Sequence, residues 1–136
     1  AIVNPADGES ATVRSDGTVE VQGYAVSGAG QRVVSVRLSV DGGEWQDAVL
    51  CSADTAAPLA AGQSSLQPHP LPHGRHWSWV LWSASVPVPV GAETVYLRCK
   101  ATDSAYNTQP EHADYNLRGY LSNAWPKVAL NLSSAK

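Results

Sequence analysis

Three histidines, His69, His73 and His76, stand close together in one short stretch of the chain. On a helix, their spacings of four and three residues would direct two imidazoles towards one metal ion. The same stretch contains three prolines and a glycine between residues 68 and 74, which do not permit a helix. We therefore expect a solvated loop and no metal site.

Two other motifs have the residue types of known sites but lack the context. Ser104, His112 and Asp114 are the residue types of a catalytic triad. A serine nucleophile also needs a sharp elbow and donors for an oxyanion, and the neighbouring sequence has neither. Gly28 and Gly30 in "SGAG" follow an expected strand, but no helical pattern comes next. These glycines predict a tight connection between strands and not a nucleotide-binding loop. We therefore assign no catalytic residue and no cofactor-binding residue to this chain.

A single arginine, Arg118, stands between Leu117 and Gly119 in the segment "NLRG". An isolated arginine is normally a solvated surface residue. Its guanidinium is also planar, permanently charged and equipped with paired donors, which suits the binding of an oxyanion. The local pattern favours the surface role, and the rest of the chain has to decide between the two.

Length and charge restrict the class of protein. The chain has 136 residues, which suits one domain, and 43% of them are apolar, which is enough for a core. Only 15% are charged, against an average of about 25%, and such a surface suits contact with another domain or subunit. The net charge is −3 and no basic stripe exists, so we expect no nucleic-acid partner. No apolar run approaches the roughly 20 residues of a membrane span, so we expect no membrane partner.

The chain has two cysteines, Cys51 and Cys99. A pair this sparse does not imply a disulfide framework, and neither residue has a second Cys or His at zinc spacing. The pattern favours two buried free thiols, with a bridge between them as the alternative.

Alternation of apolar and polar residues recurs in four stretches, at residues 18–24, 33–40, 94–101 and 127–132. This pattern is typical of strands with one buried face. The residues expected to point inward are Val19, Val21, Val34, Val36, Leu38, Val40, Val95, Leu97, Cys99, Ala101, Val128, Leu130 and Leu132. The residues between them, such as Ser35, Arg37 and Ser39, are expected to point outward.

Turn signals separate these stretches. Asp16-Gly17 precedes the first clear strand, and Asp41-Gly42-Gly43 follows the second. Asp-Gly provides the positive φ that tight hairpins need. A Pro- and Ala-rich segment near residues 53–74 predicts a long surface loop. About seven short strands in one domain, residues 1–136, predict an all-β fold, an immunoglobulin-like antiparallel β-sandwich.

The stretch "HWSWVLWSASV" is apolar on both faces. One face carries Trp77, Trp79 and Leu81, and the other carries Val80, Trp82 and Val86. We expect one face to pack in the core and the other to meet the long loop, a neighbouring domain or a second copy of the chain. Tryptophan is enriched at such interfaces.

Four motifs in order resemble one family. They are "VEVQGYAVSGAGQRVVSVRLSVDGGEW", "WSWVLWSASVPVPVG", "CKATDSAYNTQP" and "NLRGYLSNAW". Together they are similar to the molybdenum-cofactor oxidoreductase dimerisation domain, the C-terminal domain of sulfite oxidases and of assimilatory nitrate reductases. The resemblance covers residues 1–132. Arg118 in "NLRG" favours the sulfite oxidase branch, whereas Thr108 in "NTQP" resembles the nitrate reductases.

The resemblance implies a role for the chain and for Arg118. It implies a domain that assembles a homodimer beside a preceding domain of the same polypeptide, which holds the molybdenum cofactor (molybdopterin). It also implies that Arg118 reaches the pocket for sulfite, the substrate of the complete enzyme, and binds it. The chain alone is then no enzyme and holds no cofactor or metal, but it is part of a molybdenum-dependent sulfite oxidase, an oxidoreductase.

Two alternatives stay open at this point. One is the equivalent domain of a nitrate reductase. The other is a free-standing immunoglobulin-like module for adhesion or carbohydrate binding, in which the tryptophans of residues 77–82 would form a binding face. A molybdopterin-binding domain immediately upstream in the reading frame would favour the enzyme. The sequence assigns no compartment.

Overall fold

The computed structural model describes residues 1–51, 76–115, 117–118, 120 and 122–134. The described residues contain no helix, and none of them forms a helical segment long and apolar enough to cross a membrane. Their nine strands are β1 (Ile2–Asn4), β2 (Ser10–Val13), β3 (Thr18–Ala25), β4 (Val33–Val40), β5 (Gln46–Asp47), β6 (Val49–Cys51), β7 (Val80–Pro87), β8 (Thr94–Asp103) and β9 (Lys127–Ser134).

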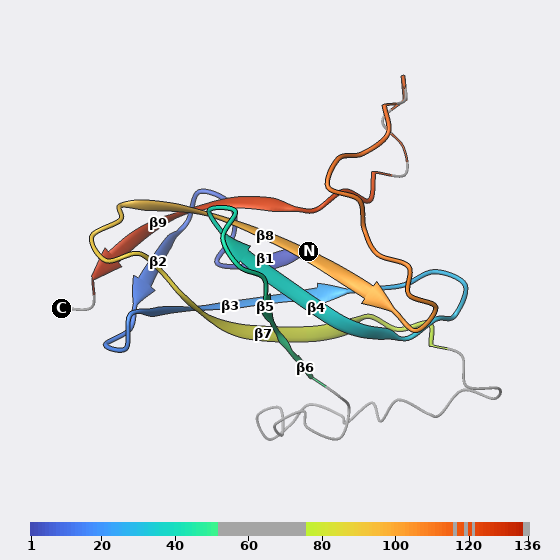
Figure 1. The fold of residues 1–136 in the computed structure, drawn as a ribbon, viewed down its shortest axis with the longest axis horizontal. Coiled ribbons are helices and arrows are strands. Elements are labelled where there is room, and N and C mark those ends of the chain that lie inside the picture. Colours follow the sequence, from blue (N-terminus) through green and yellow to red (C-terminus); the bar gives the residue numbers. More distant parts are fainter. Residues whose placement is uncertain (52–75, 116, 119, 121, 135–136) are drawn as a thin grey trace, which may run out of the picture.

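The strands form two sheets, which confirms the all-β sandwich. One sheet has the order β1-β3-β7-β6 and the other β2-β9-β8-β4-β5 (Figure 1). The pairs are antiparallel except for β2 and β9, which run parallel with Ser10 opposite Asn131. The chain enters this pairing through a turn in which the Gly8 amide donates to the Ala129 carbonyl at 2.8 Å. The sequence predicted about seven antiparallel strands. The structure has two strands more, and one of its strand pairs is parallel.

The core lies between the sheets, where the alternating positions meet. Trp82, Leu38, Leu97 and Leu130 are at most 1% exposed. Burying one such leucine contributes about 1.5–3 kcal/mol. The inward residues expected in β3, β8 and β9 are buried or partly buried, which confirms the period-two pattern.

Two positions of β4 differ from the expected alternation. Val34 is 39% exposed instead of buried, because the pairing of β4 with β8 shifts register between Val33 and Ser35 and Val33 takes the inward position. A bulge of this kind reverses the faces locally. Ser39 is buried, and its hydroxyl is satisfied by donating to the Gly43 carbonyl at 2.8 Å.

The cysteines are both free, and only one of them is buried. Cys99 lies in the core, as expected, and burial raises the pKa of its thiol to about 11. Cys51 is exposed at the end of β6, so the expectation of a buried thiol there was wrong. The strand β6 is the edge of its sheet and pairs on one side only, with β7.

The two faces of β7 behave as expected. Trp82 and Val86 are buried in the core, whereas Trp79 and Leu81 are 61% and 62% exposed on the outer face. The strand begins at Val80, so Trp77 and Trp79 lie just before it. The described residues do not decide between the long loop, a neighbouring domain and a second copy as the group that meets the outer face.

Turn chemistry explains the hairpin after β4. Asp41 and Gly42 both have positive φ, 49° and 77°, which confirms the role expected of Asp-Gly.

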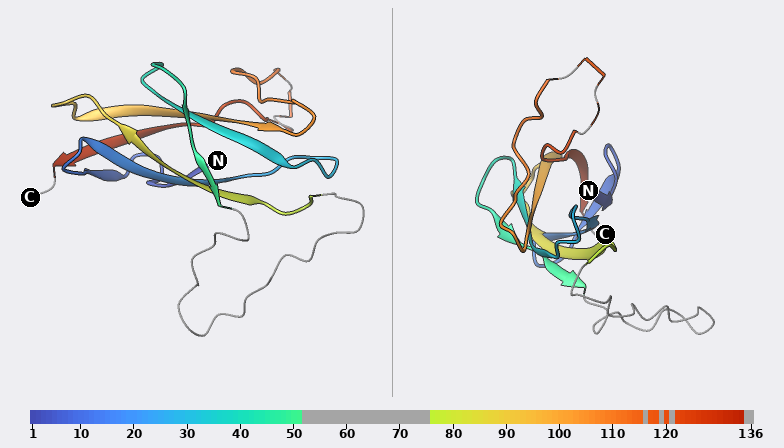
Figure 2. Two further views of the ribbon diagram at one scale, coloured as in Figure 1. Left: turned by 60° about the horizontal axis from the view of Figure 1, so that its bottom comes forward. Right: turned by 90° about the vertical axis from the view of Figure 1, so that its right-hand side faces the viewer.

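The expected loop near residues 53–74 lies outside the described residues. The connection between β8 and β9, residues 104–126, leaves the sandwich and projects from it (Figures 1 and 2). We call this connection the arm.

Candidate functional site on the arm between β8 and β9

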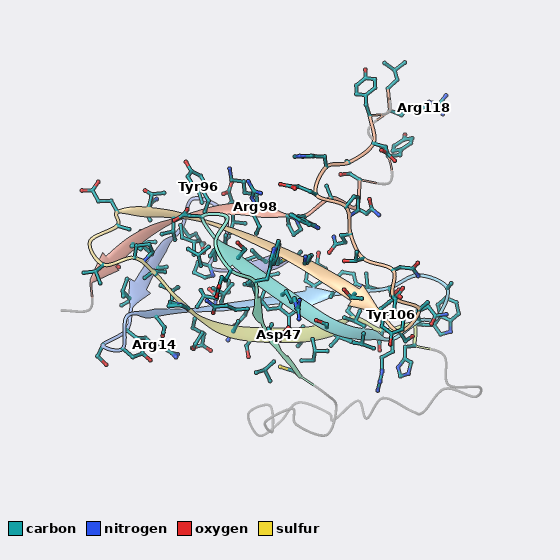
Figure 3. All side chains as sticks on the ribbon, viewed as in Figure 1. Arg14, Asp47, Tyr96, Arg98, Tyr106 and Arg118 are labelled. Atoms are coloured by element: carbon teal, nitrogen blue, oxygen red, sulfur yellow. The ribbon has the colours of Figure 1, made fainter. Side chains whose placement is uncertain are left out.

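Arg118 lies on the projecting part of the arm. Figure 3 shows it near the far end of the arm, directed away from the sandwich. The side chain is exposed, and none of the ion pairs between described residues involves it. The Arg118 guanidinium therefore lies at the surface of the described part of the chain.

Asp103, the last residue of β8, organises the first turn of the arm. Its carboxylate accepts hydrogen bonds from the Ala105 amide at 2.9 Å and from the Asn107 amide at 3.0 Å. Asn107 Nδ2 and the Ser27 hydroxyl also donate to it, at 3.0 and 2.7 Å. The hydrogen bonds from the side chains of Asn107 and then Ser27 hold the pKa of Asp103 below its usual range. The carboxylate therefore fixes the direction in which the chain leaves β8.

Gln109 and Trp125 join the two limbs of the arm. Trp125 Nε1 donates to the Gln109 carbonyl at 2.7 Å, and the Trp125 amide donates to the Pro110 carbonyl at 3.0 Å. The Gln109 side chain accepts from the Ala101 amide in β8 at 3.0 Å and donates to the Asn123 carbonyl at 3.0 Å. One glutamine thus connects β8, the outgoing limb and the returning limb.

The base of the arm is packed onto the outer face of the β4–β8–β9 sheet. The rings of Trp45 and Trp125 meet edge to face, with centroids 4.9 Å apart. Lys100 Nζ lies 4.1 Å from the centroid of Trp45 and 5.1 Å from that of Trp125, within cation–π range. Arg98 donates to Glu111 at 2.9 Å on the same face. The sequence indicated none of these contacts, because their members are far apart along the chain.

The far part of the arm exposes large apolar and aromatic side chains. Tyr115 is 89% exposed, Leu117 90% and Tyr120 68%. Exposed apolar side chains that gather on one projection mark a contact surface for another domain or subunit. Gly119 lies outside the described residues.

The other candidate residues form no site in the described part of the chain. The Ser104 hydroxyl donates to Gln31 Oε1 at 2.7 Å, whereas His112 and Asp114 are exposed on the arm, so no triad forms. His76 is exposed, and the other two histidines of its cluster lie outside the described residues. No group of three or more metal-ligating side chains occurs among the residues described.

The glycines of "SGAG" lie in the β3–β4 connection. The Gly28 carbonyl accepts from the Gln31 amide at 3.1 Å, and Gly30 has a φ of 73°. This is a tight turn between two strands, as the sequence predicted. It contains no helix that could receive a phosphate.

A cleft that the sequence did not indicate lies beside the base of the arm. Its volume is about 660 Å³, and its lining includes Tyr24, Trp82, Asp103 and Asn107. The Trp82 indole nitrogen is buried and has no hydrogen-bond partner among the described residues. No local motif signals the cleft, because its walls come from the β3–β4 connection, β7, β8 and the arm.

Comparison with known proteins places this fold and this arm in one family. The family described as the Mo-co oxidoreductase dimerisation domain matches residues 1–133. The chain belongs to this family, as its four motifs indicated.

Two kinds of relatives are similar to the chain. Human mitochondrial sulfite oxidase is 41% identical over 136 residues, which cover 98% of this chain and 22% of that protein. The NADH nitrate reductase 1 of rice (Oryza sativa subsp. japonica) is 37% identical over 115 residues, which cover 82% of this chain and 11% of that protein. The chain therefore spans about a fifth or less of the length of these relatives.

One solved structure has the same fold. The sulfane dehydrogenase SoxCD of Paracoccus pantotrophus matches 88% of this chain and 28% of its own, with a TM-score of 0.52 and 19% identity. Together the comparisons show a Mo-co dimerisation domain of the sulfite oxidase or nitrate reductase type.

Proposed function

We propose that this chain is the C-terminal dimerisation domain of a sulfite-oxidase-type molybdoenzyme. In that enzyme it assembles the homodimer, and Arg118 enters the anionic substrate pocket of a preceding molybdenum domain. The observation that carries the role of Arg118 is its position, exposed on an arm whose base is fixed to the sandwich. The family membership supports the assembly role.

The molybdenum cofactor belongs to the preceding domain and not to this chain. Cys99 is buried in the core, and Cys51 has no cluster of metal-ligating neighbours among the described residues. The described residues therefore do not fit the cofactor, and we assign no chemical step to them. The contribution of this chain is binding and placement.

Arg118 suits an oxyanion substrate for physical reasons. Its guanidinium stays charged at every relevant pH and presents donors in a plane, which matches two oxygens of sulfite. The base of the arm has little freedom, because Asp103 and Trp125 are tied by hydrogen bonds. A cation held in position loses less entropy on binding than one on a mobile chain.

The choice of sulfite over nitrate rests on two observations. The "NLRG" segment has arginine at position 118, and the relatives include a sulfite oxidase at 41% identity and a nitrate reductase at 37%. The two identities differ little, so Arg118 carries most of the preference. Nitrate is also an oxyanion, and nitrate turnover serves as the comparison in the test.

The test uses the complete enzyme with its molybdenum domain. Replacing Arg118 with Gln removes a charge-assisted contact worth about 2–3 kcal/mol. We expect kcat/KM for sulfite to fall roughly 30- to 150-fold, much of it through KM. Arg118→Lys should recover only part of the loss, because an ammonium lacks the planar pair of donors.

The matched control is Arg37→Gln. Arg37 is an exposed arginine of β4 that pairs with Asp47 at 2.8 Å. We expect this variant to keep the kinetics of the wild type. Unchanged kcat and KM in a folded, cofactor-loaded Arg118→Gln enzyme would return Arg118 to an ordinary surface role.

One observation favours the adhesion or carbohydrate-binding alternative. Tyr24 and Trp79 stack on the outer face of the β3–β7 pair, with ring centroids 4.3 Å apart and planes at 19°. A glycan-binding module would show a saturable response to oligosaccharides on a glycan array, and Trp79→Ala would abolish it. No binding on the array, together with a molybdenum domain upstream, excludes this alternative.

A further inference from the structure

A lysine on the outer face of the β4–β8–β9 sheet contacts the base of the arm. Lys100 of β8 is half-buried, and none of the ion pairs between described residues includes it. Its Nζ lies 4.1 Å from the ring centroid of Trp45 and 5.1 Å from that of Trp125. Trp45 comes from the connection between β4 and β5, and Trp125 from the returning limb of the arm. The Lys100 ammonium therefore joins the sandwich to the arm.

The cross-strand neighbour of Lys100 is also a cation. Arg37 of β4 stands opposite Lys100, and like charges in this position destabilise a sheet unless each is compensated. Arg37 has a carboxylate partner, because it pairs with Asp47 at 2.8 Å. The charge of Lys100 is compensated by the faces of two aromatic rings, and such a contact is stronger where the ammonium is partly removed from water. The stabilisation of Lys100 therefore depends on where the two rings lie.

The ring of Trp125 is held from three directions. Its indole nitrogen donates to the Gln109 carbonyl at 2.7 Å, its edge contact with Trp45 joins centroids 4.9 Å apart, and Lys100 Nζ lies within cation–π range. A hydrogen bond through one atom leaves the ring able to tilt about that atom, and the contacts with Trp45 and Lys100 oppose the tilt. The orientation of this ring sets the direction of the returning limb, and Arg118 lies farther out on the same arm (Figure 3).

We propose that Lys100 is a positioning residue for Arg118. Its ammonium holds the rings of Trp45 and Trp125 together, and this keeps the arm in the direction that brings Arg118 to the oxyanion substrate. The proposal rests on the proposed function of Arg118 and adds a residue of the sandwich to it. Without the ammonium the arm samples further directions, and the apparent dissociation constant of the substrate rises in inverse proportion to the competent fraction.

Steady-state kinetics of the complete enzyme test the proposal through Lys100→Met, which keeps an aliphatic stem on the rings and removes the charge. We expect KM for sulfite to rise roughly 3- to 10-fold, with kcat within about twofold of wild type, if about a tenth to a third of the arms keep the competent direction. Lys100→Gln is a second neutral variant with the same expected result. Lys100→Arg should keep most of the wild-type KM, since a guanidinium also binds aromatic faces.

The matched control is Lys127→Met. Lys127 begins β9 on the same outer face, and its Nζ lies 4.3 Å from the ring centroid of Tyr96, which belongs to β8 and not to the arm. Lys100→Met and Lys127→Met each remove one positive charge and its aromatic contact, so their midpoints of urea unfolding should be similar. KM should stay at the wild-type value in Lys127→Met. An equal rise of KM in both variants would overturn the proposal, because a loss of positive charge anywhere on this face would then explain it.

A double-mutant cycle shows whether Lys100 acts through Arg118. In an Arg118→Gln enzyme the arm has no guanidinium to position, so we expect Lys100→Met to leave KM unchanged in that background. A merely structural role, or a direct effect of the Lys100 charge on the substrate, would persist in both backgrounds. A rise of KM as large in the Arg118→Gln background as in the wild type therefore overturns the positioning role.

The outcomes separate this proposal from the proposed function. A folded Lys100→Met enzyme with the KM of wild type, beside an Arg118→Gln enzyme whose kcat/KM falls as expected, overturns the role of Lys100 alone. An Arg118→Gln enzyme with unchanged kinetics overturns both. A Lys100→Arg enzyme as impaired as Lys100→Met also counts against the proposal, because a cation would then be present at the rings without restoring the position of Arg118.

Discussion

Trp125 donates its indole hydrogen to the backbone carbonyl of Gln109 at 2.7 Å, across the base of the arm. The two residues are 16 positions apart, and Arg118 lies between them in the sequence. This bond closes the arm where it leaves the sandwich. The position of Arg118 relative to the sheets therefore depends on a contact at the base and not on the residues beside it.

Replacing Trp125 with Phe should destabilise the chain by about 1–2 kcal/mol. The change removes the hydrogen bond to Gln109 and part of the contact with Trp45, each worth about 1 kcal/mol. Urea unfolding followed by circular dichroism measures the loss. Tyr106→Phe is the control, since Tyr106 is an aromatic residue of the same arm that is 86% exposed, and its effect should stay within about 0.5 kcal/mol. Equal stability of the two variants would contradict the closure at Gln109.

Asp103 should make the stability of the fold depend on pH in acid. Hydrogen bonds lower its pKa in the folded state below 3.8, its ordinary value. A lowered folded pKa means that the carboxylate stabilises the fold above the unfolded pKa, and this contribution is lost as pH falls through the folded pKa. We expect Asp103→Asn to be less stable than wild type at pH 7, with a difference that shrinks as pH is lowered below about 4.

Denaturant unfolding from pH 7 to pH 2 measures this difference. Asp114→Asn, an exposed change farther along the arm, is the control and should stay within about 0.5 kcal/mol of wild type at pH 7. A wild type and an Asp103→Asn variant that differ by the same amount at every pH would contradict the role of the ionised carboxylate.

Gly23 should tolerate no side chain. A Cβ at this position would lie 2.7 Å from Cε2 of Trp82 and closer still to Cζ2, and Trp82 is 1% exposed and cannot move aside. We expect Gly23→Ala to cost about 1–3 kcal/mol through overpacking. Gly28→Ala is the control, because a Cβ there meets nothing within 4 Å. Thermal unfolding compares the two, and a Gly23→Ala chain as stable as Gly28→Ala would contradict the tight contact with Trp82.

The sequence by itself determined the strands and the family. Val19, Val21, Leu97 and Leu130 are buried as their alternation predicted, because the two-residue period of a strand is a local property of the backbone. The Asp41-Gly42 turn could also be predicted from the sequence, because the ability to adopt a positive φ is a property of single residues. The four motifs also indicated the dimerisation-domain family, which the comparison over residues 1–133 shows.

Only the tertiary structure decided where the candidate site lies and what holds it. Ser27 donates to Asp103 from 76 positions away, and Trp45 meets Trp125 from the opposite part of the chain. The bulge that exposes Val34 depends on how β4 pairs with β8, and the exposure of Cys51 depends on β6 being an edge. Such features arise from the pairing of distant segments, and a local pattern carries no information about the segment that becomes its neighbour.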